Sequence, residues 1–151
     1  MTAQRWLTDE QLQTWTGFLA VNTALSKRVE QQLRIDCGLS HSQYEVLVRL
    51  SAAPDGKLRM TELAGIARTS KSGLTYQVDQ LERAGLVRRS SAPGDDRGWF
   101  AMLTPAGRRV LDQTSPAHAE LVRSLFVDAL TDEQFAGLAK AIEALRAGLN
   151  V

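Results

Sequence analysis

The sequence predicts a mainly α-helical fold that carries one small β-hairpin. At three places a Ser or Thr is followed three residues later by Gln or Glu, which is a typical helix start, and apolar residues at helical spacing come next. Residues 86–103 differ, because two runs typical of strands flank a polar stretch that contains Pro93 and Gly94. These observations predict helices around a short hairpin, within a single domain that spans residues 1–151.

The first predicted helix runs from about Asp9 to about Ile35. Thr8 with Gln11 forms a capping box in front of it, and Gly38 ends it. Its apolar residues lie on more than one face: Leu12, Trp15, Phe18, Leu25, Val29 and Leu33. A helix with that distribution is expected to pack against more than its own core.

The second predicted helix is shorter and has two candidate caps. Either Ser40 with Gln43 or Ser42 with Glu45 begins it. Its apolar positions are Tyr44, Val46, Leu47 and Leu50. A turn follows at residues 53–56, where Pro, Asp and Gly stand together.

Two further short helices follow an extended piece at residues 58–60. Thr61 is expected to cap the first of them, and Thr69 or Ser70 to cap the second. Gly85 ends the second helix just beyond its last turn, where a left-handed residue is favoured.

The hairpin comes next in the chain. Residues 86–89 and residues 99–103 are predicted to be its strands. The polar residues 90–98 between them are expected to form a long loop at its tip.

The C-terminal part is predicted to be helical. Thr104 and Pro105 begin a long helix that reaches about Leu130, and Pro116 is expected to kink or interrupt it. Thr131 with Gln134 then caps the last helix. Its apolar positions are Phe135, Leu138, Ile142, Leu145 and Leu149.

The composition is that of a globular protein, with 44% hydrophobic and 23% charged residues. No apolar run approaches the roughly 18 residues that a membrane-spanning helix needs, so we expect no membrane partner. The N-terminal residues contain no apolar signal core, so a cytoplasmic location is expected. The single cysteine, Cys37, excludes an internal disulfide and a multi-cysteine metal site.

The positive charge is concentrated in the middle of the chain. Residues 57–90 carry seven basic and three acidic side chains, a net charge of +4 in a protein whose total is +1. Residues 105–151 carry five basic and six acidic side chains, a net charge of −1. A local excess of basic residues suits a polyanionic partner.

Two short helices followed by a two-stranded hairpin form the pattern of a winged helix-turn-helix. In the second of these helices, residues 71–84, the apolar side chains Leu74, Val78 and Leu81 fall on one side. The polar side chains fall broadly opposite: Ser72, Thr75, Tyr76, Asp79 and Arg83. That polar side is free to enter a major groove of DNA, which is wide enough to admit a helix.

The hairpin places Arg97 near its tip. An arginine there could reach the adjacent minor groove, whose negative potential attracts guanidinium groups. Asp95 lies two residues earlier and could orient that arginine through a charge-assisted hydrogen bond. Alternatively, Arg97 could only close the hairpin by pairing with Asp95.

Residues 61–107 resemble the MarR family of bacterial transcriptional regulators. The resemblance is carried by Leu81, Gly85, Leu86, Val87 and Arg89 at the end of the helix, and then by Asp95, Arg97, Leu103, Thr104 and Gly107. It covers nearly the whole chain, because the flanking helices also fit. It implies a winged helix-turn-helix lobe over residues 40–103, and dimerisation helices over residues 9–36 and 105–149.

The resemblance also implies a homodimer that binds double-stranded DNA. The residues it places against DNA are Ser70, Lys71, Ser72, Thr75, Tyr76, Arg88 and the wing arginine, Arg97, with Asp95 orienting the wing. Lys71, Arg88 and Arg89 could instead form a solvated face, and Tyr76 could be an ordinary surface tyrosine. The implied function is a repressor that binds a pseudo-palindromic operator and responds to a small molecule. No cofactor is implied.

A pocket for a phenolic or aromatic effector has three candidate residues, Trp15, Phe18 and His41. In the family such pockets lie between the dimerising helices and the DNA-binding lobe. An aromatic residue on a core-facing stripe is more often part of the core. Cys37 has an acidic neighbour, Asp36, which disfavours a reactive thiolate, so a structural thiol is expected.

Two other classes of protein fit the sequence less well than a DNA reader does. An enzyme is not indicated, because no phosphate-binding loop, nucleophile elbow or metal-ligand spacing is present. A winged helix that binds only proteins would more typically expose apolar anchors than small polar residues. The sequence therefore favours a regulator over either alternative.

Overall fold

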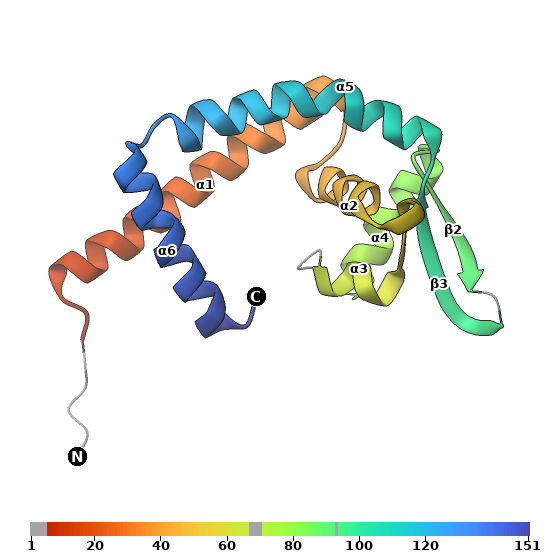
Figure 1. Ribbon diagram of the computed structural model, residues 1–151, viewed down its shortest axis with the longest axis horizontal. Coiled ribbons are helices and arrows are strands. Elements are labelled where there is room, and N and C mark those ends of the chain that lie inside the picture. Colours follow the sequence, from red (N-terminus) through yellow and green to blue (C-terminus); the bar gives the residue numbers. More distant parts are fainter. Residues whose placement is uncertain (1–5, 67–70, 93) are drawn as a thin grey trace, which may run out of the picture. The chain divides into compact units, whose positions relative to one another are not determined.

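The computed structural model describes residues 6–66, 71–92 and 94–151 of the chain (Figure 1). Its internal contacts divide the chain into two compact units, Met1–Pro116 and Ala117–Val151, and each is described by itself. The predicted class, mainly α-helical with a small hairpin wing, is confirmed. A third strand joins the hairpin, so that the sheet has the antiparallel order β1-β3-β2.

Helix α1 spans Asp9–Cys37, and both of its ends are set by local sequence. The Thr8 hydroxyl accepts from the Gln11 backbone N–H at 3.2 Å, and the Gln11 side chain accepts from the Thr8 N–H at 2.9 Å. At the other end Gly38 is left-handed, with φ 72°, and its N–H donates to the Arg34 carbonyl at 3.1 Å. The predicted capping box and glycine stop are therefore confirmed.

Helix α2 spans His41–Ala52, and Ser40 caps it. The Ser40 hydroxyl and the Gln43 side chain satisfy each other's backbone N–H groups, so the alternative cap at Ser42 was wrong. The predicted turn is a single 3-10 turn over Pro54–Gly56, in which Asp55 and Gly56 are left-handed. It returns the chain toward strand β1, Lys57–Arg59.

Helix α3 spans Met60–Ile66, which places Thr61 inside the first turn. The prediction that Thr61 caps this helix was wrong. The Glu62 carboxylate, on the third residue of the helix, instead accepts from the backbone N–H of Arg59, the residue before the helix, at 2.9 Å. The predicted caps of the next helix, Thr69 and Ser70, lie outside the described residues.

Helix α4 spans Lys71–Arg83 and ends in a Schellman motif. The Leu86 N–H donates to the Leu81 carbonyl at 3.0 Å, and the Gly85 N–H donates to the Glu82 carbonyl at 2.9 Å. Gly85 has φ 75°, a conformation that costs a residue with a Cβ. The predicted stop at Gly85 is confirmed.

The hairpin strands are longer than predicted. Strand β2 spans Val87–Ala92 and strand β3 spans Asp95–Leu103, so the expected loop over residues 90–98 was wrong. Pairing is regular from Val87 opposite Leu103 to Ser91 opposite Trp99, and it then shifts, because Ala92 lies opposite Asp95. The residues between Asp95 and Trp99 therefore form a bulge in β3, which lets a polar segment remain extended.

The core of unit 1 lies between α2, α3, α4 and the inner face of the sheet. Its members are almost fully buried: Leu33, Leu39, Tyr44, Val46, Leu47, Leu50, Leu63, Leu74, Val78, Leu81, Leu86, Val87, Ala101 and Leu111. The Tyr44 hydroxyl lies 3.0 Å from the Ser115 hydroxyl and links α2 to α5, which spans Pro105–Val122. Within unit 1, Figure 1 shows α2, α3 and α4 gathered beside the hairpin.

The start of α5 is tied to the base of the hairpin. The Thr104 N–H donates to the Leu86 carbonyl at 3.1 Å, and its hydroxyl donates to the Gly85 carbonyl at 2.7 Å. The same hydroxyl accepts from the Gly107 N–H at 3.1 Å. Gly107 is buried against Leu86 and Leu103, with no room for a side chain.

Of the kink or interruption expected at Pro116, the interruption was wrong, because α5 continues through Pro116 to Val122. A π-helical segment follows over Arg123–Val127, so the helix ends before the expected Leu130. Unit 2 continues with α6, Asp132–Leu149, whose predicted capping box at Thr131 and Gln134 is confirmed. Across the described residues, no helix is both long and apolar enough to cross a bilayer.

Candidate nucleic-acid interface

Helix α4 has one buried side and one polar, solvent-facing side. Leu74, Val78 and Leu81 are at most 1% exposed, and they belong to the same core as Leu47 and Leu63. On the opposite side, the residues that are exposed are Ser72, Thr75, Tyr76 and Arg83. Tyr76 is 61% exposed, so most of its surface faces solvent. The predicted division of this helix into an apolar, buried side and a polar, exposed side is present.

The N-terminal end of α4 is only partly described. Lys71 is its first residue, so the predicted contact residues Ser72, Thr75 and Tyr76 fall within its first two turns. Ser70 lies outside the described residues, and so does the side chain of Lys71. Ser72 and Thr75, which have small side chains, are both exposed.

The two arginines that end the predicted strand lie on opposite faces of the sheet. Arg88 pairs across β3 with Met102, and Met102 pairs with Lys57 on the far side. Arg89 pairs with Ala101, which is fully buried. Since side chains alternate along a strand, Arg88 points to the outer, exposed face and Arg89 to the inner face.

Arg89 is held against α4 by two carboxylates. Its Nε donates to Glu82 Oε2 at 2.8 Å, and its Nη2 lies 2.7 Å from Asp79 Oδ1. The contact with Asp79 is an ion pair whose angles do not form an aligned hydrogen bond. The three side chains are about one third exposed, at 30%, 36% and 35% for Arg89, Asp79 and Glu82. Arg89 is therefore occupied within the chain, whereas Arg88 is exposed.

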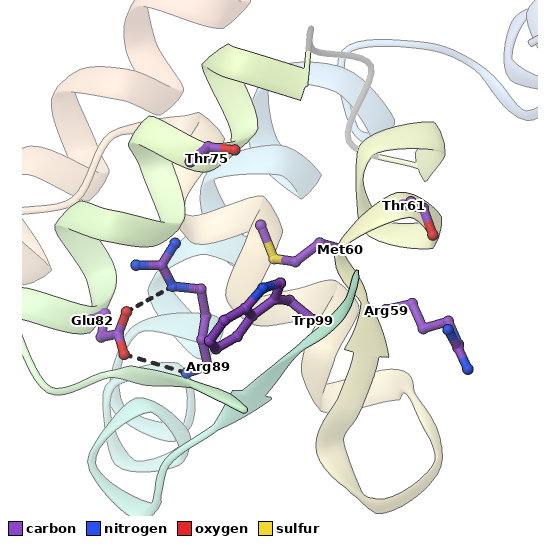
Figure 2. A pocket seen from close by; sticks show the side chains of 8 residues that line it. Arg59, Met60, Thr61, Thr75, Glu82, Arg89 and Trp99 are labelled. Carbon is purple, nitrogen blue, oxygen red and sulfur yellow. Dashed lines mark hydrogen bonds and ion pairs between the residues drawn. The ribbon is translucent and has the colours of Figure 1, made fainter. Parts of the chain in front are cut away.

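A cleft of about 690 Å³ separates α4 from the wing (Figure 2). Thr75 and Glu82 line it from α4, Arg89 and Trp99 from the hairpin, and Met60 from the start of α3. Trp99 is 51% exposed. In Figure 2 the Trp99 indole lies beside the Arg89 side chain, and the two Arg89–Glu82 contacts form one wall.

The wing arginine occupies the bulge of β3. Asp95 pairs with Ala92 and Trp99 pairs with Ser91, so Arg97 falls in the segment that has no opposing residue on β2 in this register. A bulge commonly re-aims a side chain at a sheet edge. The side chains of Asp95 and Arg97 lie outside what the structure describes, so the predicted pair between them is not tested.

The outer face of the sheet gathers further positive charge around Phe100. The Lys57 ammonium lies 5.7 Å from the centre of the Phe100 ring, and the Arg59 guanidinium lies 5.1 Å from it. Both are cation–π distances. Because Lys57 and Arg88 flank Met102 in the register, Lys57, Arg59 and Arg88 share this face.

The three residues predicted for an effector pocket are not brought together within one chain. Trp15 and Phe18 stack on each other with ring centres 6.1 Å apart, and they are 52% and 54% exposed. The His41 backbone N–H donates to the Glu30 carboxylate at 2.7 Å. Glu30 is 12 residues (30 − 18) beyond Phe18 on α1, or roughly 18 Å along the helix. His41 therefore lies far from the aromatic pair.

Cys37 is half-buried, and its Sγ lies 3.2 Å from the Leu33 carbonyl. This contact within the last turn of α1 fits the structural role that the sequence indicates. Within the described part of the chain, no cluster of three or more His, Cys, Asp or Glu side chains could hold a metal ion.

Comparison with known proteins identifies the family. The family profile of the MarR family matches residues 39–98. Sco3205 of Streptomyces coelicolor, a MarR family regulator solved in complex with DNA, is 39% identical, with a TM-score of 0.95 over 100% of this chain and 94% of that one. AbsC, a MarR family regulator of the same organism, is 37% identical, with a TM-score of 0.92 over 97% of this chain and 99% of that one.

Curated relatives match over a shorter length. The transcriptional repressor YetL of Bacillus subtilis is 33% identical over 97 residues, which is 64% of this chain and 58% of YetL. The regulator YkoM of the same organism is 30% identical over 97 residues, which is 62% of YkoM. The matched region thus spans less than two thirds of either relative.

The chain belongs to the MarR family of DNA-binding transcriptional regulators, and the expected resemblance is confirmed. The relatives named above are regulators and not enzymes.

Proposed function

We propose that this protein is a homodimeric repressor that binds a pseudo-palindromic operator and is released from it by a small molecule. The observation that carries the proposal is the polar, exposed side of α4, opposite a stripe that is at most 1% exposed. A helix fixed to its domain on one side presents the other side to a major groove in a defined orientation.

In this proposal α4 reads bases and the wing contacts the minor groove. Lys71, Ser72, Thr75 and Tyr76 face the major groove from the first two turns of α4, and Ser70, the preceding residue in the sequence, contacts the same groove. Arg97 enters the minor groove from the bulge of β3, with Asp95 as its orienting partner. Arg88, exposed on the outer face of the sheet, contacts a phosphate. The complex of Sco3205 with DNA supports this mode of binding, as does that regulator's 39% identity with the chain.

The proposed dimer accounts for apolar side chains that a single chain leaves exposed. On α1 they include Leu12 and Val21, each at least 50% exposed. On α6 they include Leu145 and Leu149, at 59% and 69%. Surface of this kind marks an interaction site. The dimerisation regions in the proposal are residues 9–36 and 105–149, and residues 40–103 form the DNA-binding lobe.

Repression and effector control are the finer parts of the proposal. YetL, which carries the name of a repressor, supports repression. The exposed, stacked pair Trp15 and Phe18 supports a flat aromatic or phenolic effector, since such a ligand stacks on exposed rings. His41 joins this pocket only if the partner chain or a rearrangement brings it near the pair.

The test is selection of bound duplexes from a random DNA pool. The most enriched duplex is then titrated with the protein by fluorescence anisotropy at two salt concentrations. We expect an enriched palindrome whose half-sites are about one helical turn apart, and a steep loss of affinity with salt. A folded dimer that enriches no sequence would refute the operator-binding function. The enriched duplex then serves as the probe for a screen of aromatic effectors.

A further inference from the structure

We propose that Arg89 is a positioning residue for DNA recognition, which fixes the angle between the reading helix α4 and the wing without contacting DNA itself. This inference rests on the proposed operator binding. It concerns a residue that the sequence groups with Arg88 in one basic run, and that the structure separates from Arg88.

The geometry joins the two parts of the molecule that meet the two grooves. Asp79 and Glu82 lie on the C-terminal half of α4, three residues apart, and Arg89 lies on β2. One guanidinium spans both carboxylates, at 2.7 Å and 2.8 Å. The Arg89 backbone N–H also lies 3.4 Å from Glu82 Oε1, so that the strand and the side chain are both tied to the helix. We call these three residues the Arg89 bridge.

The neighbourhood of the Arg89 bridge explains why the angle needs fixing. The cleft of about 690 Å³ lies between α4 and the wing, and the bridge forms one wall of it. The core cluster that includes Val78, Leu81 and Val87 holds α4 to the base of the hairpin, and toward the open cleft Arg89 adds polar contacts to α4. A reading helix and a minor-groove arginine must each be in register with the same duplex.

Charge supplies a second reason. Asp79 and Glu82 stand on the helix that approaches DNA, where bare carboxylates repel phosphates. Arg89 neutralises the negative charge of these two carboxylates from within the chain. While it does so, its guanidinium does not contact a phosphate. The opposing view is that Arg89 leaves the carboxylates and binds a phosphate directly. The two views predict opposite signs for the same substitution.

The deciding experiment compares affinity for the selected operator with affinity for a random duplex of equal length, across a range of salt concentrations. Glu82→Gln keeps Arg89 and weakens the bridge. We expect the ratio of operator affinity to random affinity to fall about tenfold, with no increase in the salt dependence. If Arg89 is a phosphate contact, Glu82→Gln frees it, so both affinities and the salt dependence increase, and the positioning role is overturned.

Arg89→Gln and Arg88→Gln form a matched pair of variants on the same strand. Arg89 lies on the inner face of the sheet and Arg88 on the outer face. Arg89→Gln should lower the affinity ratio and leave the salt dependence unchanged. Arg88→Gln should lower both affinities together. It should also reduce the slope of log affinity against log salt concentration by the amount expected for about one phosphate contact. Identical behaviour of the two variants would overturn the proposal. If Arg89→Gln does not fold, as judged by circular dichroism, Glu82→Gln decides the question.

A readout without DNA keeps the bridge testable even if no operator exists. Replacing Trp6 and Trp15 by Phe leaves Trp99, beside Arg89 in the cleft, as the single tryptophan. In that background Glu82→Gln should increase the quenching of Trp99 fluorescence by acrylamide, because the cleft opens. Unchanged quenching together with an unchanged affinity ratio would refute the positioning role of the Arg89 bridge. If the wild-type protein enriches no palindrome, only the proposed function is refuted.

Discussion

Substitution of Gly107 by alanine tests the junction between the hairpin and α5. A Cβ at this position would lie 2.7 Å from Leu103 Cδ1 and still closer to the Leu86 carbonyl oxygen. Contacts under 3.0 Å do not occur for real Cβ atoms, and the Leu86 carbonyl is backbone, which cannot turn aside as a side chain can. The helix must therefore move away from the hairpin.

The size of the effect follows from what that movement disturbs. Overpacking in a buried site costs about 1–3 kcal/mol. The Thr104 N–H bond to the Leu86 carbonyl, 3.1 Å long, would lengthen, and a lost hydrogen bond costs about 1 kcal/mol. Alanine recovers about 1 kcal/mol through its higher helix propensity. We therefore expect a net loss of about 1–3 kcal/mol in the free energy of unfolding.

The assay is guanidinium denaturation followed by circular dichroism, with all variants at one protein concentration because dimers gain stability with concentration. The control is Gly65→Ala in α3, where nothing lies within 4 Å of the added Cβ. That control should be neutral or stabilised by up to about 1 kcal/mol. If Gly107→Ala is as stable as its control, α5 does not approach Leu86 as closely as we describe.

Three further predictions concern the reading helix, the wing and the core. Tyr76→Ala should change the preference for one base per half-site by about 1–3 kcal/mol in a competition assay with single-base operator variants. An equal loss of affinity for all sequences would show that Tyr76 contacts only the DNA backbone. Arg97→Ala should weaken operator binding in anisotropy titrations while sedimentation still shows the dimer; loss of the dimer would mean that the wing is misplaced. Tyr44→Phe removes the hydroxyl that lies 3.0 Å from Ser115 and should cost about 1 kcal/mol of unfolding free energy, whereas unchanged denaturation would show that this pair adds nothing.

Helix boundaries were predictable because local chemistry sets them. The capping boxes at Thr8 and Thr131 need only residues three positions apart, and the stops at Gly38 and Gly85 need only a left-handed residue. The cap at Thr61 failed for a related reason. The helix begins at Met60, one residue before Thr61, and the carboxylate of Glu62, three residues beyond the strand, accepts from the Arg59 N–H as the third residue of the helix.

The wing was harder to predict because strand pairing is not local. Residues 90–98 are rich in Ser, Asp and Gly, which disfavour strands when judged alone. Pairing with a partner strand and a bulge keep most of them extended. The sequence did contain a signal for the Arg89 bridge, since Arg89 shares its side of the strand with the apolar Val87, and Asp79 and Glu82 are spaced for one helix face.

The alternation of Arg88 and Arg89 limits how the wing can change in length. Inserting one residue between Val87 and Arg88 would exchange the two faces, burying the outer arginine and exposing the inner one. Beyond Ser91 the pairing already shifts, so a length change there alters only the size of the bulge. Related wings should therefore differ in length at the tip and keep a constant number of residues in the paired base of the hairpin. Designed extensions of the wing belong beyond Ser91.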